Sequence, residues 1–559
     1  MALALAVLAG GLTGSIVLPF GPNGGLHLAL DAVSAPFLLI VCVSGAAAAL
    51  ECETPLIPVA VGAPVLTLLA ADGFTLVLGV GTASAVAWAL DRQTRPGLAQ
   101  AACGTLFLAA ALLLLAPPDA GLDLRFTAMR AAPPDGMRAF AVLLLALLSA
   151  GSCLVWPSRS RPVGALLSGS TTAVAAYALV RVLFDLCGPT VPAWWGVSLL
   201  TLGAVGTVLG GLRANAADDL LAILAAGRMG AAGLISVGLG VALAARGSDL
   251  MPLAALAFAG ALLHATSYAV FDTLLVLCAM AVSRGAGTQL LSQLGGLIRT
   301  MPGVGLGALA GAVCLAGLPL TAGFAGRWLL VQSLIADQRL GGFWLQVGFA
   351  LVLAAVGLGS ALAAAAAVRL IGVGFLGRPR TVQAAAAEDA PRQVRLVIAG
   401  LAACCLLLGV WPSAALALIQ PALRQLLGLG MEGGRFLAIS SQLDSPGYVA
   451  PGIAAVLALS GVAVAWARSR LATLAPRRVP AWDEGQEGAS PGLPGEPTAQ
   501  HSAASAAQAL LQSLSWPAFL PGLQRVSRAA RGRIGRLTPA RSAGALLLVL
   551  AGLLLWAAV

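Results

Sequence analysis

The chain has 559 residues, of which 59% are hydrophobic and 10% are charged, and its mean hydropathy is +0.94. These values exclude a water-soluble globular protein, whose surface needs far more polar groups. The formal net charge of +10 at pH 7 does not indicate nucleic-acid binding, because the arginines stand singly or in small groups at the ends of apolar runs. The composition therefore predicts a chain that lies mostly in lipid.

Long apolar runs follow one another along the chain, separated by short breaks that carry proline, glycine or arginine. A spanning helix needs about 20 mostly apolar residues, so the runs predict an all-α polytopic membrane protein with about 14–16 transmembrane helices. The runs near 251–282, 303–334 and 343–376 exceed one span, which indicates two short helices or one interrupted helix in each. The other runs lie near 2–20, 29–49, 55–71, 73–90, 100–116, 137–156, 162–184, 193–212, 219–245, 394–418, 448–467 and 542–558.

Composition also divides the chain into parts. A polar segment at 468–541, rich in arginine, proline and glycine, predicts an extramembrane excursion before a terminal anchor helix at 542–559. The apolar part before it comprises N-terminal helices at 1–155, a core at 156–420 and a further core helix at 421–467. Arginines mark alternate loops, so the positive-inside rule predicts a cytoplasmic N-terminus.

Ionisable residues within apolar runs are candidates for function, because a charge at the membrane centre costs at least about 2.5–3.5 kcal/mol. Arg181 precedes Asp185 by four residues, a helical spacing that allows a structural ion pair. Asp31 and Asp185 lie near the ends of runs, where both a cap or loop contact and a polar pathway are open interpretations. The full set is Asp31, Arg181, Asp185, Arg228, His264, Asp272, Arg327 and Arg369.

His264 and Asp272 form the most informative pair in this set. Their separation of eight residues places them on one helix face two turns apart, with Thr266, Ser267 and Tyr268 between them. A polar stripe in lipid must face protein or water, so it either joins helices through hydrogen bonds or relays protons through a histidine that titrates near neutral pH. The residues alone leave both interpretations open.

The run at 317–324 places the helix breakers Gly317, Pro319 and Gly323 and the hydroxyl of Thr321 inside an apolar stretch. Such a break frees backbone carbonyl groups, and broken helices recur in transporter sites. In contrast, no catalytic motif, phosphate loop or metal-ligand pattern is present, and the nine cysteines form no C-x-x-C pair. We therefore expect no catalytic residues, no cofactor and no metal in this chain.

Four segments, in this order, resemble the antiporter-like membrane subunits of respiratory complex I, cation/proton antiporter complexes and membrane-bound hydrogenases. Residues 162–169 with 177–185 resemble the family's "P-x-S-A-L-L-S-G … Y-x-L-x-R" helix. Asp219 and Leu220 resemble the start of "D-L-K-R-L-L-A-Y-S-S". Residues 262–271 resemble "L-x-H-x-x-x-H-A-x-F-K", and 317–329 resemble "S-G-L-P-P-x-x-G-F-x-S-E-W-L".

Segments farther on, at 368–380 and 482–499, are similar to the branch of the family that comprises hydrogenase-4 component B and formate hydrogenlyase subunit 3. The resemblance implies inverted helix repeats, broken helices and a lysine, glutamate and histidine chain that moves protons along the membrane midplane. It makes 156–420 the proton-translocation core of a multi-pass protein of the bacterial inner membrane. It also implies a non-catalytic subunit that adjoins other membrane subunits and a peripheral redox arm.

The departures from the family fall on its proton-carrying positions. The chain has no lysine; the family lysine after Gly169 aligns with Ala173, the lysine after Phe271 is Asp272, and the glutamate of "S-E-W-L" is Arg327. The span at 74–90 also lacks the expected glutamate. The remaining relay candidates are His264, Asp272, Arg369, Arg181, Asp185 and Asp219.

These departures predict a subunit that keeps the antiporter-like fold with a degenerate proton path and serves mainly in assembly. One alternative is an active proton or Na⁺ translocating subunit with a rerouted relay through Asp31, Asp185, His264, Asp272 and Arg369. Another is a free-standing secondary transporter, which is disfavoured because the apolar runs contain few polar residues.

Overall fold

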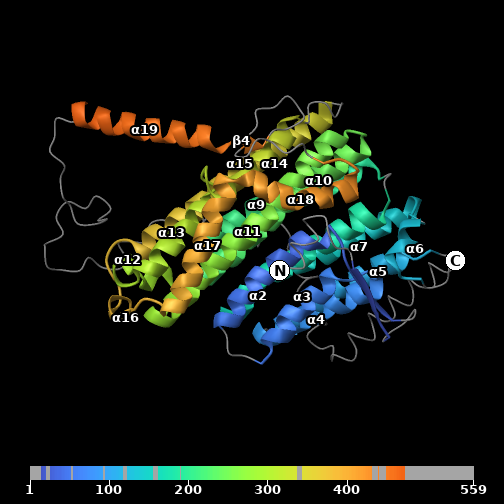
Figure 1. The fold of residues 1–559 in the computed structure, drawn as a ribbon, viewed down its shortest axis with the longest axis horizontal. Helices are drawn as coiled ribbons and strands as arrows, with labels where there is room; N and C mark the ends of the chain where they lie inside the picture. Colours follow the sequence, from blue (N-terminus) through green and yellow to red (C-terminus); the bar gives the residue numbers. More distant parts are fainter. Residues whose placement is uncertain are drawn as a thin grey trace, which may run out of the picture.

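The computed structural model describes an elongated bundle of helices (Figure 1). It covers residues 14–19, 25–51, 55–91, 95–117, 123–131, 133–154, 162–188, 191–336, 343–430, 438–439 and 448–471. The sequence predictions for 472–541 and for the anchor at 542–559 lie outside the described residues, as does most of the first apolar run.

The described part of that first run is not helical. Residues Gly14–Leu18 form strand β1, which pairs antiparallel with β2 (Leu26–Leu30). The expectation of a helix at 2–20 is therefore wrong for these residues. The β-branched Ile16 and Val17 favour a strand, and Gly25 adopts a φ of +137° that only glycine tolerates easily, immediately before β2.

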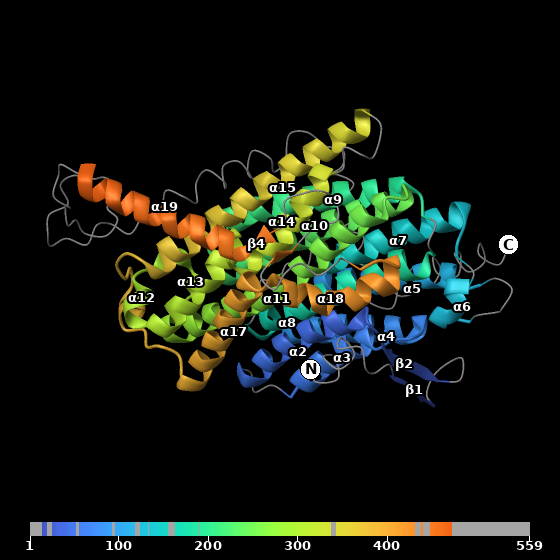
Figure 2. The same ribbon diagram turned by 45° about the horizontal axis from the view of Figure 1, so that its top comes forward.

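The N-terminal part continues as a group of helices that packs beside the core (Figures 1 and 2). Proline begins or ends several of the loops between them, because it cannot continue a helix. The helices are α2 (Ser34–Glu51), α3 (Ile57–Leu68), α4 (Gly73–Asp91), α5 (Arg95–Leu115), α6 (Phe126–Ala131) and α7 (Gly136–Leu154).

The core consists of longer helices, two of which end in a π-helical turn. A π-helical turn inserts an extra residue and often marks a functional position. The core helices are α8 (Pro162–Val180) with its π-turn η3 (Arg181–Leu186), α9 (Ala193–Ala216), α10 (Leu220–Gly247), α11 (Met251–Ala286), α13 (Pro302–Ala316), α14 (Ala322–Ile335), α15 (Phe343–Arg369) with its π-turn η6 (Leu370–Phe375), α17 (Arg392–Val410) and α18 (Pro412–Leu427). Short elements join them: η4 (Leu291–Gln293), α12 (Leu297–Thr300), α16 (Val382–Ala385), β3 (Ala438–Ile439) and β4 (Tyr448–Val449).

Helix α11 runs through the middle of the bundle and contacts α10, α13, α14 and α17 (Figure 1). It is a single helix of 36 residues whose most apolar window is 94% buried. The run at 251–282 therefore forms one long helix and not two short ones. It contains no proline after its first turn, so nothing breaks its backbone hydrogen bonds.

The run at 303–334 does form two helices, as the glycine and proline pattern predicts. Helix α13 ends at Gly317, which has a left-handed φ of +73°, and Leu320 has a φ of +68° before α14 begins. Inside the break the Thr321 hydroxyl donates to the Leu318 carbonyl at 2.7 Å. The break exposes the carbonyl end of α13 to side chains from α14.

Helices α9 and α10 pack closely through glycines. A Cβ on Gly203 would lie 2.6 Å from the Gly233 carbonyl oxygen, and one on Gly240 would lie 2.6 Å from the Leu200 nitrogen. Gly196, Gly203 and Gly210 recur every seven residues along α9, so they form one stripe that faces α10. Small residues at this interface set the position of α10, which carries part of the site below.

Seven described helices are long and apolar enough to cross a membrane, and six shorter apolar helices accompany them. This supports the predicted polytopic membrane fold. The last described helix, α19 (Ala450–Leu471), extends away from the bundle (Figure 2), and none of its apolar window is buried in this chain.

Candidate functional site

Buried ionisable residues gather in several places. The first is the Arg181 cluster, which we define as Asp31, Arg130, Tyr177, Arg181 and Asp185. Arg181 lies on the π-turn η3, is 2% exposed, and forms ion pairs of 2.7 Å with Asp185 and 2.8 Å with Asp31. Its Nε and Nη2 donate to the Tyr177 hydroxyl, while Arg130 pairs with Asp185 at 2.7 Å. Two carboxylates thus balance two guanidinium groups.

The Arg181–Asp185 pair agrees with the helical spacing in the sequence. The contact with Asp31 comes from a residue 150 positions away, so only the tertiary structure brings it in. Asp31 lies before α2, outside the spanning helices. Burial raises the pKa of its carboxyl, but Arg181 and the hydrogen bonds from Ser34 outweigh that effect and lower the pKa from 3.8 to about 2.

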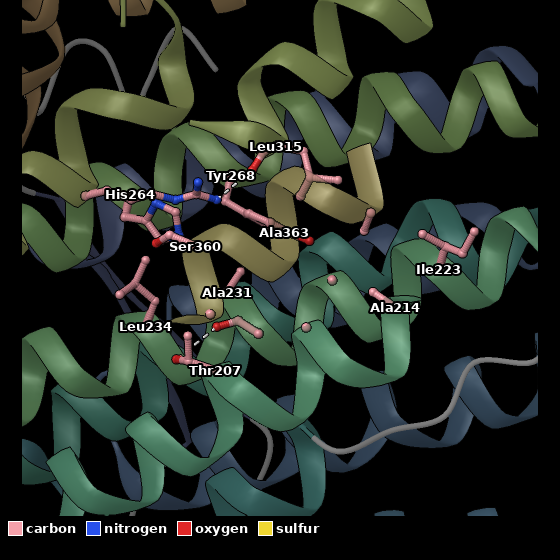
Figure 3. Close-up of a pocket in the computed structure, with 16 residues that line it drawn as sticks. Thr207, Ala214, Ile223, Ala231, Leu234, His264, Tyr268, Leu315, Ser360 and Ala363 are labelled. Atoms are coloured by element: carbon pink, nitrogen blue, oxygen red, sulfur yellow. Dashed lines mark hydrogen bonds between the residues drawn. The ribbon is translucent and has the colours of Figure 1, made fainter. Parts of the chain in front are cut away.

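The second place is the His264 cavity, a space of about 30 Å³ for the centres of water molecules between α9, α10, α11, α13, α14 and α15 (Figure 3). His264 on α11 is 1% exposed, and neither of its ring nitrogens has a hydrogen-bond partner among the described residues. Tyr268 lies one turn farther along α11 with its ring centre 6.0 Å from that of His264. The hydroxyl residues Thr207 and Ser360 also line the cavity.

Arg327 of α14 also lines this cavity. Its Nη2 donates to the Leu315 carbonyl at 2.9 Å, in the last turn of α13, which the break at Gly317 leaves accessible. Its Nε and Nη1 are buried and have no partner within the part of the chain that the structure describes. The sequence identified Arg327 as an ionisable residue in lipid but offered no reason to place it beside His264.

Asp272 does not line the His264 cavity and instead pairs with Arg228 of α10. Its carboxylate lies 3.3 Å from Nη1 of Arg228, and the two side chains are 3% and 6% exposed. The sequence interpretation treated Asp272 as part of a stripe with His264 and did not pair it with Arg228, which lies 44 residues earlier. Only the packing of α10 against α11 brings the two charges together.

The third place is the end of α15. Arg369 donates to the Asn215 carbonyl at 2.7 Å and lies 3.9 Å from Asp218, so it caps the carbonyl end of α9. Asp219 is the N-cap of α10, and its side chain accepts a hydrogen bond of 2.9 Å from the Ala222 amide. Both residues therefore have local structural contacts, and their participation in a relay stays a prediction.

Apolar groups lie between the Arg181 cluster and the His264 cavity. Phe184 of η3 packs on Phe258 of α11 with ring centres 5.0 Å apart, less than two turns before His264. Ala173, where the family resemblance places a lysine, is buried. Among the described residues, neither His264 nitrogen hydrogen-bonds to any member of the Arg181 cluster, and no group of His, Cys, Asp and Glu could hold a metal ion.

Comparisons with known proteins place this geometry in a family. A family model described as NADH:quinone oxidoreductase/Mrp antiporter, TM, matches residues 155–354. An uncharacterized protein of Mycobacterium tuberculosis is 31% identical over 504 residues, which cover 82% of this chain and 77% of the relative. The chain belongs to the antiporter-like membrane subunit family.

A further relative and a solved structure are also similar to this chain. Formate hydrogenlyase subunit 3 of Escherichia coli is 32% identical over 317 residues, which cover 55% of this chain and 52% of that protein. The fold is also similar to a chain of the membrane-bound sulfane sulfur reductase, an archaeal respiratory membrane complex. The TM-score is 0.73 at 21% identity, covering 99% of this chain and 93% of the other. The chain is thus an integral multi-pass membrane protein with the antiporter-like fold.

Proposed function

We propose that this chain is a membrane subunit of a multi-subunit oxidoreductase complex in the bacterial inner membrane, and that its own proton path is interrupted. Similarity to formate hydrogenlyase subunit 3 and to a subunit of an archaeal respiratory complex supports the first part. Other membrane subunits lie beside it, and a peripheral arm holds the redox centres. Its main role is structural: it supports the assembly and the stability of the membrane part of that complex.

The buried Arg228–Asp272 ion pair carries the proposal of an interrupted path. A relay group must gain and lose a proton, whereas the attraction of a guanidinium group 3.3 Å away opposes protonation of this carboxylate. The family resemblance places a lysine, a basic group, at this position. With Ala173 in place of the second lysine, the midplane has lost two of its proton-accepting sites.

An active subunit with a rerouted relay is the second candidate. The His264 cavity supports it, because its volume of about 30 Å³ exceeds the roughly 10–15 Å³ that one water centre needs. Water beside His264 would offer a proton partner that the side chains do not. The two candidates differ in whether His264 and Asp272 change protonation during turnover.

Proteoliposomes with the complex purified through a tag on this chain distinguish them. We expect His264→Ala, and the neutral double replacement Arg228→Leu with Asp272→Leu, to pump as many protons per electron as the wild-type complex. Thr273→Ala, which removes a hydroxyl that donates to the Ala269 carbonyl of the same helix, is the matched control. A reduced ratio in a variant that assembles normally would establish the rerouted relay, and purification of this chain alone, without redox cofactors, would refute membership of a complex.

A further inference from the structure

Arg327 is an arginine with buried guanidinium nitrogens and no ion pair to a carboxylate among the described residues. The three other buried arginines, Arg181, Arg228 and Arg369, each lie within 4 Å of an aspartate. Arg327 forms no such ion pair with any described residue, although its Nε and Nη1 are buried. A guanidinium group remains charged in proteins, and an unpaired charge at membrane depth is costly.

Only one nitrogen of the Arg327 guanidinium group, Nη2, has a hydrogen-bond acceptor among the described residues. The Leu315 carbonyl accepts from Nη2 at 2.9 Å and holds the group at the end of α13. Gly317 lies directly against Nη1 of Arg327. A Cβ at this position would collide with Nη1, so only glycine leaves room for the guanidinium group here. Nε and Nη1 are left as two charged donors without acceptors among the described residues.

The cavity beside Arg327 has the size and polarity that an acceptor would need. Figure 3 shows His264 and Tyr268 at one end of it, with Ser360 close by and Thr207 on the opposite wall. His264 is 1% exposed and its nitrogens have no described partner, so a neutral imidazole would present a second type of N–H donor to the same space. The rest of the lining is apolar or glycine apart from Arg327 itself.

We infer that this cavity binds a small monovalent anion, such as chloride, between Arg327 and His264. Water alone would fill the space but would leave the positive charge of Arg327 uncompensated in a low-dielectric interior. The space of about 30 Å³ for the centres of water-sized probes is enough for a group of that size, so a small monovalent ion such as a halide is the simplest occupant. The inference holds for any complex that contains the chain and does not rest on the proposed function.

Equilibrium binding of radioactive chloride to the purified complex, in sodium gluconate at constant ionic strength, tests the inference. We expect saturable binding of about one ion per copy of this chain, competed by bromide, and a rise of the thermal unfolding midpoint when chloride replaces gluconate. Arg327→Gln is expected to weaken binding by at least about tenfold, the loss for one charge-assisted hydrogen bond. Arg213→Gln, which removes an exposed arginine of α9, is the matched control.

Ala363→Val keeps the test decisive if Arg327→Gln does not fold. Ala363 lines the cavity, so two added methyl groups would reduce the space available to an anion while Arg327 stays intact. This variant should lose chloride binding and keep assembly. Binding that does not saturate, that is equal in both variants and the wild type, or that follows ionic strength alone would overturn the inference.

Discussion

Removing the carboxylate of Asp272 should destabilise this protein far more than removing both members of its ion pair. The pair bridges α10 and α11 at 3.3 Å, and both side chains are less than a tenth exposed. Asp272→Leu removes one member of a buried ion pair, whereas the double replacement Arg228→Met with Asp272→Leu leaves only apolar groups of similar size. The two variants therefore separate the cost of losing one charge from the net value of the pair.

The magnitude follows from the geometry. At 3.3 Å and an effective dielectric constant of about 20, the attraction is about 5 kcal/mol, which is comparable to the desolvation cost of the two ions. The net contribution of the pair is therefore small. Loss of one partner from a buried pair costs about 3–5 kcal/mol, so we expect this for Asp272→Leu and less than about 1 kcal/mol for the double variant.

Unfolding in mixed detergent and denaturing micelles, followed by far-ultraviolet circular dichroism, measures both free energies. The exchange of charges in Arg228→Asp with Asp272→Arg should recover much of the stability lost in either single variant, because the pair is restored with opposite polarity. If Asp272→Leu is as stable as the wild type, the carboxylate is not paired in a dry interior and the argument for an interrupted path fails.

Three further predictions concern packing, pH and capping. Gly203→Ala should weaken the contact of α9 with α10, where a Cβ would meet backbone at 2.6 Å, whereas Gly206→Ala, with its nearest neighbour at 3.4 Å, should be neutral in thermal unfolding. Because the pKa of Asp31 is lowered from 3.8 to about 2, its pairing with Arg181 stabilises the fold fully above pH 4 and is lost as the pH falls toward 2. The unfolding midpoint should drop across that window, and Asp31→Asn should flatten the drop. Asp219→Ala should cost about 1 kcal/mol and Asp219→Asn less, as for an N-cap, with proton uptake unchanged; loss of uptake in the asparagine variant would instead make Asp219 a relay group.

The sequence alone predicts that the chain lies in lipid, that it is helical, and that a core helix is broken near Gly317. Apolar runs of spanning length predict membrane helices because each backbone group must be satisfied within its own segment. The break at Gly317 was predictable because glycine and proline disfavour a helix at their own positions. The Arg181–Asp185 pair was predictable because a spacing of four residues is about one helical turn. The strand at 14–18 was missed, since a short apolar run has no period that separates strand from helix.

The partners of the buried charges were decided only by the tertiary structure. Asp272 pairs with Arg228 because α10 packs against α11, and Arg181 pairs with Asp31 because η3 lies beside the turn before α2; no spacing along the chain encodes such contacts. The orphaned guanidinium group of Arg327 is likewise visible only once every neighbouring element is in place. In a low-dielectric interior the energy of a charge depends on distances of a few ångströms, which the sequence sets through the whole fold and not through any local pattern.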